Sequence, residues 1–126
     1  MENKVVMDKD VAFITVENNK NLEVTLCSLG ASFYRVVYKG LNRIMTPINH
    51  EEFYNNQQYY GKLVGRFSGR IDDGVCQINN KTYNLPKNWG GISSLHGGDK
   101  GISFSNFKYE LKEEEKSFDV VFYFTE

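Results

Sequence analysis

The C-terminal part of the chain places bulky apolar side chains at every second position, a period that only an extended strand puts on one face. Residues 118–125 do so most clearly, with Phe118, Val120, Phe122 and Phe124. Residues 107–111 alternate in the same way, and the charged stretch 112–116 separates the two runs. Such a charge run indicates a solvated hairpin turn. The pattern therefore predicts two antiparallel strands.

The same period recurs through the rest of the chain. Residues 11–16 and 21–30 bracket a turn at 18–21, and residues 32–40 resume a strand after a break at Gly30. Residues 74–86 are typical of a hairpin, because Asn79 and Asn80 tolerate the positive φ of a tight turn.

Only residues 49–54 suggest a helix, with Asn49 as cap and Glu52 three positions later. We therefore expect an all-β, antiparallel fold with at most one short helix. At 126 residues, the chain has the length of a single domain, 1–126.

Composition excludes several classes of function. The net charge is −1 and no basic block is present, so no nucleic-acid partner is expected. The charged first ten residues do not resemble a signal peptide, and no apolar run is long enough to span a membrane. Cys27 and Cys76 lack metal or redox spacing, which favours two reduced, partly buried thiols. A cytoplasmic protein is expected.

The strand over 118–125 is followed only by Glu126. An aromatic strand left at a sheet edge is prone to pair with another chain. We therefore expect the chain to be part of a larger β domain, or to form a homo-oligomer through this strand.

Two polar clusters could carry chemistry. In residues 65–71, Arg66 and Arg70 lie four apart beside Gly65 and Gly69. Glycines allow close approach, and arginine offers a rigid fork of donors to an anion or a polyol. Two structural salt bridges are the alternative reading.

The second cluster is the glycine-rich segment 88–101 around His96. This histidine is either a surface loop residue or a hydrogen-bonding group beside a cleft. The segment lacks Walker spacing, so a nucleotide loop is not expected. Among the acidic residues, Asp72 and Asp73 with Gly74 indicate a turn, and Asp99 has no assignable carboxylate partner. No metal-ligand set or catalytic triad is visible.

Read together, these segments resemble one family. The kinked strand "LCSLGASFYRVVYKG", the G-R-x-x-x-R-I element in 65–71 and the "LHGG" element in 95–98 are similar to galactose mutarotases (aldose 1-epimerases). The order is the same from Leu22 to Gly98. One departure is Gly69, where most members have asparagine.

The resemblance implies a galactose mutarotase-like supersandwich, of which this chain is an incomplete, N-terminal portion. It implies interconversion of the α and β anomers of an aldohexose, such as galactose or glucose, by general acid–base catalysis without metal or cofactor. Arg70 and His96 would bind the sugar, with Arg66 as a less central contact.

The family's catalytic histidine and glutamate match no residue here, so no catalytic residue is assigned and the chain alone is expected to be inactive. His50, the other histidine, is expected to be solvent-exposed. Two alternatives stay open: a non-catalytic carbohydrate-binding or sensing module, and a self-associating β fragment.

Overall fold

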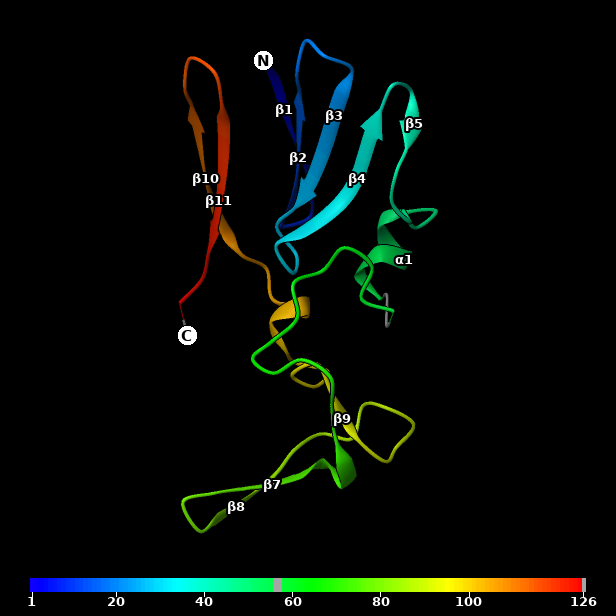
Figure 1. Cartoon of the computed structure of the whole chain (residues 1–126), viewed down its shortest axis with the longest axis vertical. Helices are drawn as coiled ribbons and strands as arrows, with labels where there is room; N and C mark the ends of the chain where they lie inside the picture. The colour runs from blue at the N-terminus through cyan, green and yellow to red at the C-terminus, as the bar shows by residue number, and fades with distance from the viewer. Residues whose placement is uncertain (56–57, 126) are drawn as a thin grey trace. The chain divides into compact units, whose positions relative to one another are not determined.

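The computed structural model describes residues 1–55 and 58–125, which form two compact units. The first unit joins Met1–Leu63 to Asn106–Glu126, and the second is the intervening segment Val64–Ser105. All strand pairings among the described residues are antiparallel, and the one α-helix there belongs to the first unit (Figure 1). The predicted antiparallel β class with at most one short helix is therefore confirmed. The single domain expected over 1–126 stays a prediction.

Five antiparallel strands in sequence order form the sheet of the first unit. They are β1 (Glu2–Asp8), β2 (Val11–Glu17), β3 (Leu22–Cys27), β4 (Ser32–Tyr38) and β5 (Leu41–Asn42). The strands expected over 11–16, 21–30 and 32–40 are confirmed as β2, β3 and β4.

The alternation of apolar and polar residues did not predict β1, and the exposure of its side chains explains why. The side chains of Glu2 to Met7 are all exposed, so neither face of this edge strand carries an apolar pattern. Pairing along its whole length with β2 defines it instead, from Glu2 opposite Glu17 to Asp8 opposite Val11.

Asparagine and glycine make the turns of this sheet. Asn18 Oδ1 accepts the backbone N–H groups of Lys20 (2.9 Å) and Leu22 (3.0 Å), which closes the predicted turn before β3. At the predicted break before β4, Gly30 has φ 68° and Ala31 has φ 43°. The kink therefore lies where the sequence indicates it.

Phe13, Cys27 and Phe53 form the buried core of the first unit. Phe53 is the buried residue of helix α1 (His50–Tyr54). As predicted, Asn49 caps this helix by accepting the Glu52 N–H at 2.8 Å. The Glu52 carboxylate in turn accepts the Ile48 N–H at 2.7 Å.

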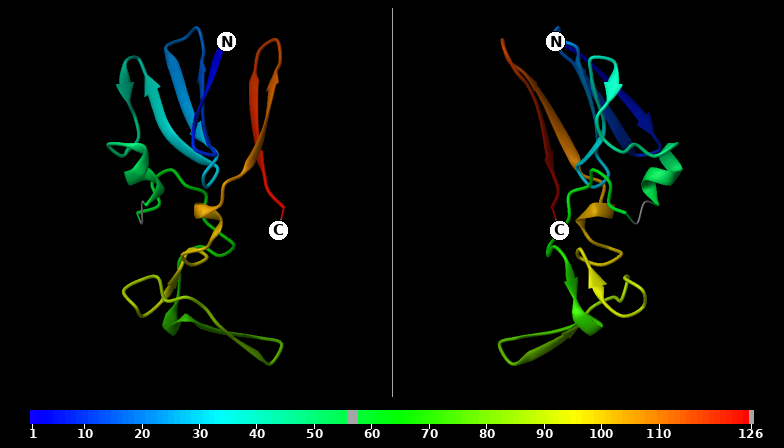
Figure 2. Two further views of the ribbon diagram at one scale, coloured as in Figure 1. Left: turned by 180° about the vertical axis from the view of Figure 1, so that it is seen from behind. Right: turned by 45° about the vertical axis from the view of Figure 1, so that its right-hand side comes forward.

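The hairpin of β10 (Lys108–Glu113) and β11 (Phe118–Tyr123) lies alongside the five-stranded sheet in every view (Figures 1 and 2). Phe118 and Val120 line an apolar groove of about 270 Å³ together with Val24 and Leu26 of β3. Both predicted strands are confirmed, although β11 ends at Tyr123, and Glu126 lies outside the described residues.

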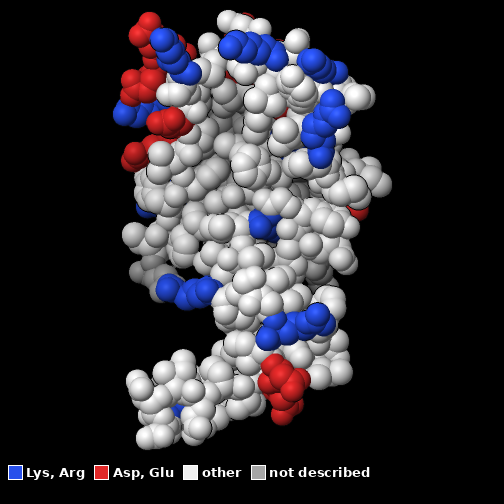
Figure 3. Space-filling model, viewed as in Figure 1, with Lys and Arg blue, Asp and Glu red and all other residues white. Residues whose placement is uncertain are grey.

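The charged turn of this hairpin is solvated, as expected. Lys112 Nζ lies 2.9 Å from Glu114 Oε1, and both side chains are at least half exposed. Figure 3 shows acidic and basic side chains interleaved over the end of the hairpin.

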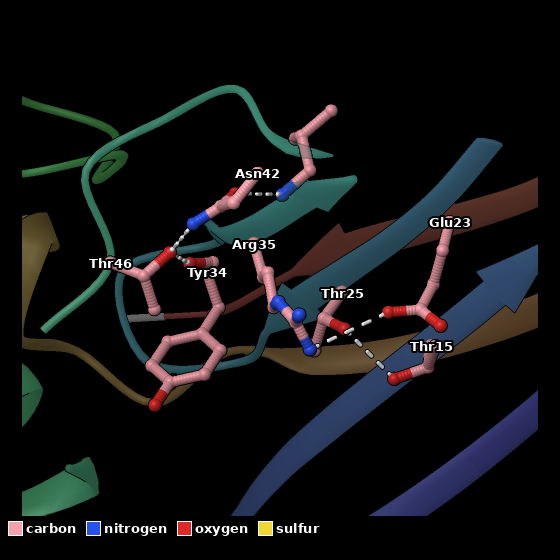
Figure 4. A network of polar contacts seen from close by, with 8 residues as sticks. Thr15, Glu23, Thr25, Tyr34, Arg35, Asn42 and Thr46 are labelled. Carbon is pink, nitrogen blue, oxygen red and sulfur yellow. Dashed lines mark hydrogen bonds and ion pairs between the residues drawn. The ribbon is translucent and has the colours of Figure 1, made fainter. Parts of the chain in front are cut away.

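One face of the sheet carries a polar network (Figure 4). The hydroxyls of Thr15 and Thr25 lie 2.9 Å apart across β2 and β3. Glu23 and Arg35 form a longer ion pair, at 3.8 Å, across β3 and β4. Nearby, Thr46 donates to the Tyr34 carbonyl at 3.0 Å, which ties the chain after β5 back to β4.

The second unit contains two pairs of short strands. Hydrogen bonds join β6 (Arg70–Ile71) to β9 (Ser94–Leu95), and β7 (Val75–Ile78) to β8 (Lys81–Asn84). Two 3₁₀ helices, η1 (Asp72–Gly74) and η2 (Ile102–Phe104), complete it.

The hairpin predicted over 74–86 is confirmed as β7–β8. Its central residues, Asn79 (φ 50°) and Asn80 (φ 62°), both have positive φ, as a type I′ turn requires. The predicted Asp72–Asp73–Gly74 turn is also present, as η1.

Cys27 is buried, Cys76 is partly buried, and both are free thiols. Among the residues that the structure describes, no helix has the length and apolar character needed to cross a bilayer.

Candidate functional site

Two short strands of the second unit bring Arg70 and His96 to neighbouring positions. Arg70 of β6 pairs with Leu95 of β9. The next residue, His96, donates its backbone N–H to the Gly69 carbonyl at 3.0 Å. The two predicted sugar-binding residues are thus adjacent in one small ladder, although the sequence separates them.

A hydrogen bond also fixes the ring of His96. The Gly69 N–H donates to its Nδ1 at 3.0 Å. Because Nδ1 is the acceptor, the neutral imidazole carries its proton on Nε2. His96 is partly exposed and has φ 50°, a left-handed backbone for a non-glycine residue. Its ring is therefore a defined donor on a constrained loop.

Glycines allow the arginine-bearing and histidine-bearing loops to pack backbone against backbone. A Cβ on Gly97 would lie 1.9 Å from the Gly65 carbonyl oxygen, and one on Gly101 would lie 3.0 Å from it. That carbonyl accepts the Ile102 N–H at 3.3 Å. Gly97 and Gly101, which both follow His96, are required by this close approach.

Arg70 extends over an aromatic ring rather than toward a carboxylate. Its guanidinium carbon lies 5.3 Å from the centroid of the Trp89 ring. Within residues 1–55 and 58–125, its side chain forms no ion pair and no hydrogen bond. The structural salt bridge considered for Arg70 is therefore absent, and its donors remain for a ligand.

Arg66 lies in the loop before β6 and is exposed, but it has further contacts within the protein. Its proposed contact with a ligand therefore stays a prediction.

Sequence reasoning missed Asn88. Its Oδ1 accepts the Leu95 N–H at 2.8 Å, and its Nδ2 donates to the Leu95 carbonyl at 3.0 Å. The Asn88 amide thus bonds the backbone of β9 as a neighbouring strand would, and it holds Leu95, the strand partner of Arg70. The available signal was an asparagine directly before a Trp-Gly-Gly turn, a place where side-chain amides often bond the backbone.

The acidic residues do not form a second centre. Asp73 is an exposed turn residue whose carboxylate lies 3.3 Å from Lys87 Nζ. The described residues contain no group of three or more potential metal-binding side chains. The turn reading of Asp72 and Asp73 is therefore the one the structure supports.

His50 is solvent-exposed only in part, with 38% of its side chain accessible, and its ring also makes contacts within the protein. Its ring stacks on Phe13, with centroids 4.0 Å apart and an interplanar angle of 11°. Its Nδ1 lies 3.2 Å from Asp8 Oδ2, which also accepts the Tyr54 hydroxyl at 2.5 Å. These contacts lower the pKa of Asp8, the Tyr54 hydrogen bond most strongly. Position on a short helix could not reveal this, because Phe13 and Asp8 are distant in sequence.

Comparison with known proteins agrees with the motifs. The profile of the aldose 1-epimerase family matches residues 12–126. An aldose 1-epimerase from Streptococcus thermophilus is 31% identical over 105 residues, which cover 79% of this chain and 30% of that protein. A galactose mutarotase from Bos taurus is 43% identical over 52 residues, 41% of this chain and 15% of that protein.

The fold is also that of solved sugar epimerases. The crystal structure of galactose 1-epimerase from Lactobacillus acidophilus NCFM matches with a TM-score of 0.75 and 24% identity, covering 90% of this chain and 35% of that one. The predicted β-sandwich class of the galactose epimerases is thus confirmed for the described fold.

The match to the family profile then identifies the family to which this β-sandwich protein belongs. The chain belongs to the aldose 1-epimerase family. It spans about a third of the length of the Streptococcus thermophilus relative, 30%.

Proposed function

We propose that this chain forms the sugar-binding side of an aldose 1-epimerase, an isomerase that interconverts the α and β anomers of an aldohexose such as galactose or glucose. Arg70 and His96 hold the sugar, and Arg66 contributes a further contact. The observation that carries the proposal is that Arg70, whose guanidinium lies over Trp89, pairs in β6 with the residue next to His96, whose ring is oriented by the Gly69 N–H.

The chemistry of these two side chains suits a neutral pyranose. Sugar hydroxyls and the ring oxygen offer lone pairs, and both Arg70 and the Nε2–H of His96 are donors. Donors fixed by β6, β9 and the Gly69 amide lose little freedom when a sugar binds. They orient the sugar and polarise its ring oxygen.

Proton transfer requires groups that these residues do not supply. In this family a glutamate takes the anomeric hydroxyl proton and a histidine protonates the ring oxygen. No residue of this chain matches either position, and His50 is engaged with Asp8 and Phe13. These 126 residues therefore bind sugar without catalysing anomer exchange at an appreciable rate.

Polarimetry and NMR together test the proposal. Freshly dissolved α-D-galactose should mutarotate at its spontaneous rate with the chain present, because the missing proton-transfer groups contribute about 10²–10⁴-fold each. In the NMR titration, the ring signals of His96 should shift saturably at tens of millimolar sugar.

The chain provides its own control, since His50 is the only other histidine. Its signals should stay unchanged. A large acceleration would show that the assignment of proton-transfer groups is wrong. A static His96 signal would rule out the sugar site.

A further inference from the structure

Trp89 is the only tryptophan of the chain, and 44% of it is exposed. An exposed tryptophan normally has no special role on a loop. Here, however, the ring lies beneath the one arginine of the proposed site that has no ionic or hydrogen-bonded partner in the described protein.

The loop that carries Trp89 is tightly closed. Ile92 N–H donates to the Trp89 carbonyl at 3.1 Å, and the two residues between them, Gly90 (φ 60°) and Gly91 (φ 68°), both have positive φ. This is the backbone of a type I′ turn. Trp89 N–H also donates to the Ser93 carbonyl at 3.0 Å. The indole therefore projects from a short hairpin of defined shape.

The base of that hairpin is tied to the strand opposite Arg70. Asn88, directly before Trp89, bonds both backbone groups of Leu95, and Leu95 is the strand partner of Arg70. These contacts fix the backbone positions from which the Trp89 and Arg70 side chains extend, relative to each other.

An aromatic ring holds an arginine differently from a carboxylate. A carboxylate takes up two of the five N–H donors, whereas a ring attracts the cation through its π face and leaves the donors available. We infer that Trp89 is a positioning residue for the sugar site, one that restricts the guanidinium of Arg70 without using its hydrogen-bond donors. The inference rests on the proposed sugar-binding function.

Binding measurements on four variants test it. Galactose affinity is measured by calorimetry for the full chain and for Trp89→Leu, Trp89→Phe, Arg70→Gln and the double variant Arg70→Gln with Trp89→Leu. Trp89→Leu should weaken binding about two- to fivefold, the worth of an exposed cation–π contact. Trp89→Phe keeps an aromatic face and should lose less.

The double variant separates positioning from a general loss of structure. If Trp89 acts through Arg70, removing the tryptophan should cost nothing further once Arg70 is glutamine. A loss of the same size in both backgrounds would overturn the inference. Amide exchange of β7–β8, a hairpin of the same unit, checks that each variant remains folded.

Fluorescence gives an independent readout, because Trp89 is the only tryptophan in the sequence and its emission can be observed selectively. Arg70→Gln should change the emission of the sugar-free protein, and galactose should change that of the unmodified chain. Binding that is equally tight in Trp89→Leu, with emission unaffected by sugar, would reject the role of Trp89 and leave the proposed function intact. Absence of any binding to the unmodified chain would reject both.

Discussion

At the scale of single residues, Lys62 is the least expected feature of the chain. This lysine is only 8% exposed, and its Nζ lies 4.8 Å from the centroid of the buried Phe53 ring. Burial lowers the pKa of the Lys62 ammonium to about 8. Burial changes the pKa of nearby Cys27 in the opposite direction, raising that of its thiol to about 11.

The lowered pKa of Lys62 predicts stability that rises between pH 8 and 9. In this range the unfolded lysine, with its pKa near 10.5, still binds a proton that the folded protein has begun to release. Lys62 alone should therefore raise the free energy of unfolding by about 1 kcal/mol across that interval. Urea denaturation at several pH values measures it.

Lys62→Met is the matched variant, because methionine keeps a long apolar stem without the charge. The rise from pH 8 to 9 should vanish in it. Cys27 opposes part of this rise as the pH approaches 9, and more strongly above it, because the unfolded thiol loses its proton while the folded one keeps it. A variant whose stability rises as steeply as that of the unmodified protein would show that Lys62 is not the titrating group.

At the scale of elements, α1 shows how a very short helix is held. Its five residues contribute little intrinsic stability, so the cap and the buried Phe53 matter most. The Asn49 side chain accepts the Glu52 N–H at 2.8 Å, and the Glu52 carboxylate accepts the Ile48 N–H at 2.7 Å. The helix also carries His50 onto Phe13, which ties it to β2.

Asn49→Ala should lower the free energy of unfolding by about 1 kcal/mol, the usual worth of an N-cap. Asn49→Asp keeps the oxygen that accepts the Glu52 N–H and should cost much less. Denaturant titration of both variants makes the comparison. Equal losses in the two would mean that the cap hydrogen bond is not what stabilises α1.

The elements also differ in how well the sequence predicts them. β2, β3, β10 and β11 alternate clearly, and paired asparagines mark the β7–β8 turn, so local pattern was sufficient. β1 is an edge strand with exposed faces, and β6 and β9 are two residues long, so no period could reveal them. β1 forms by pairing along its length with the adjacent strand β2, and β6 and β9 form by pairing with each other although they are distant in the sequence.

At the scale of the whole molecule, some features of the candidate site could be predicted from the sequence and others could not. His96 could be picked out because Gly97 beside it marks a close approach of two loops, and Arg70 because it shares a glycine-containing segment with Arg66. The contact of Arg70 with Trp89, the clamp of Asn88 on Leu95 and the stack of His50 on Phe13 could not. Each joins groups that come together only when the chain folds, and the family resemblance gave no information about these contacts.

The central claim is that Arg70 and His96 hold one sugar together. Calorimetric titration of galactose into the full chain, Arg70→Gln, His96→Gln and the double variant tests it most directly. Each single change should weaken binding about tenfold, as expected when a charged or oriented donor is lost. The double change should leave no measurable binding. Galactose affinity that is unchanged in Arg70→Gln and in His96→Gln would contradict the account.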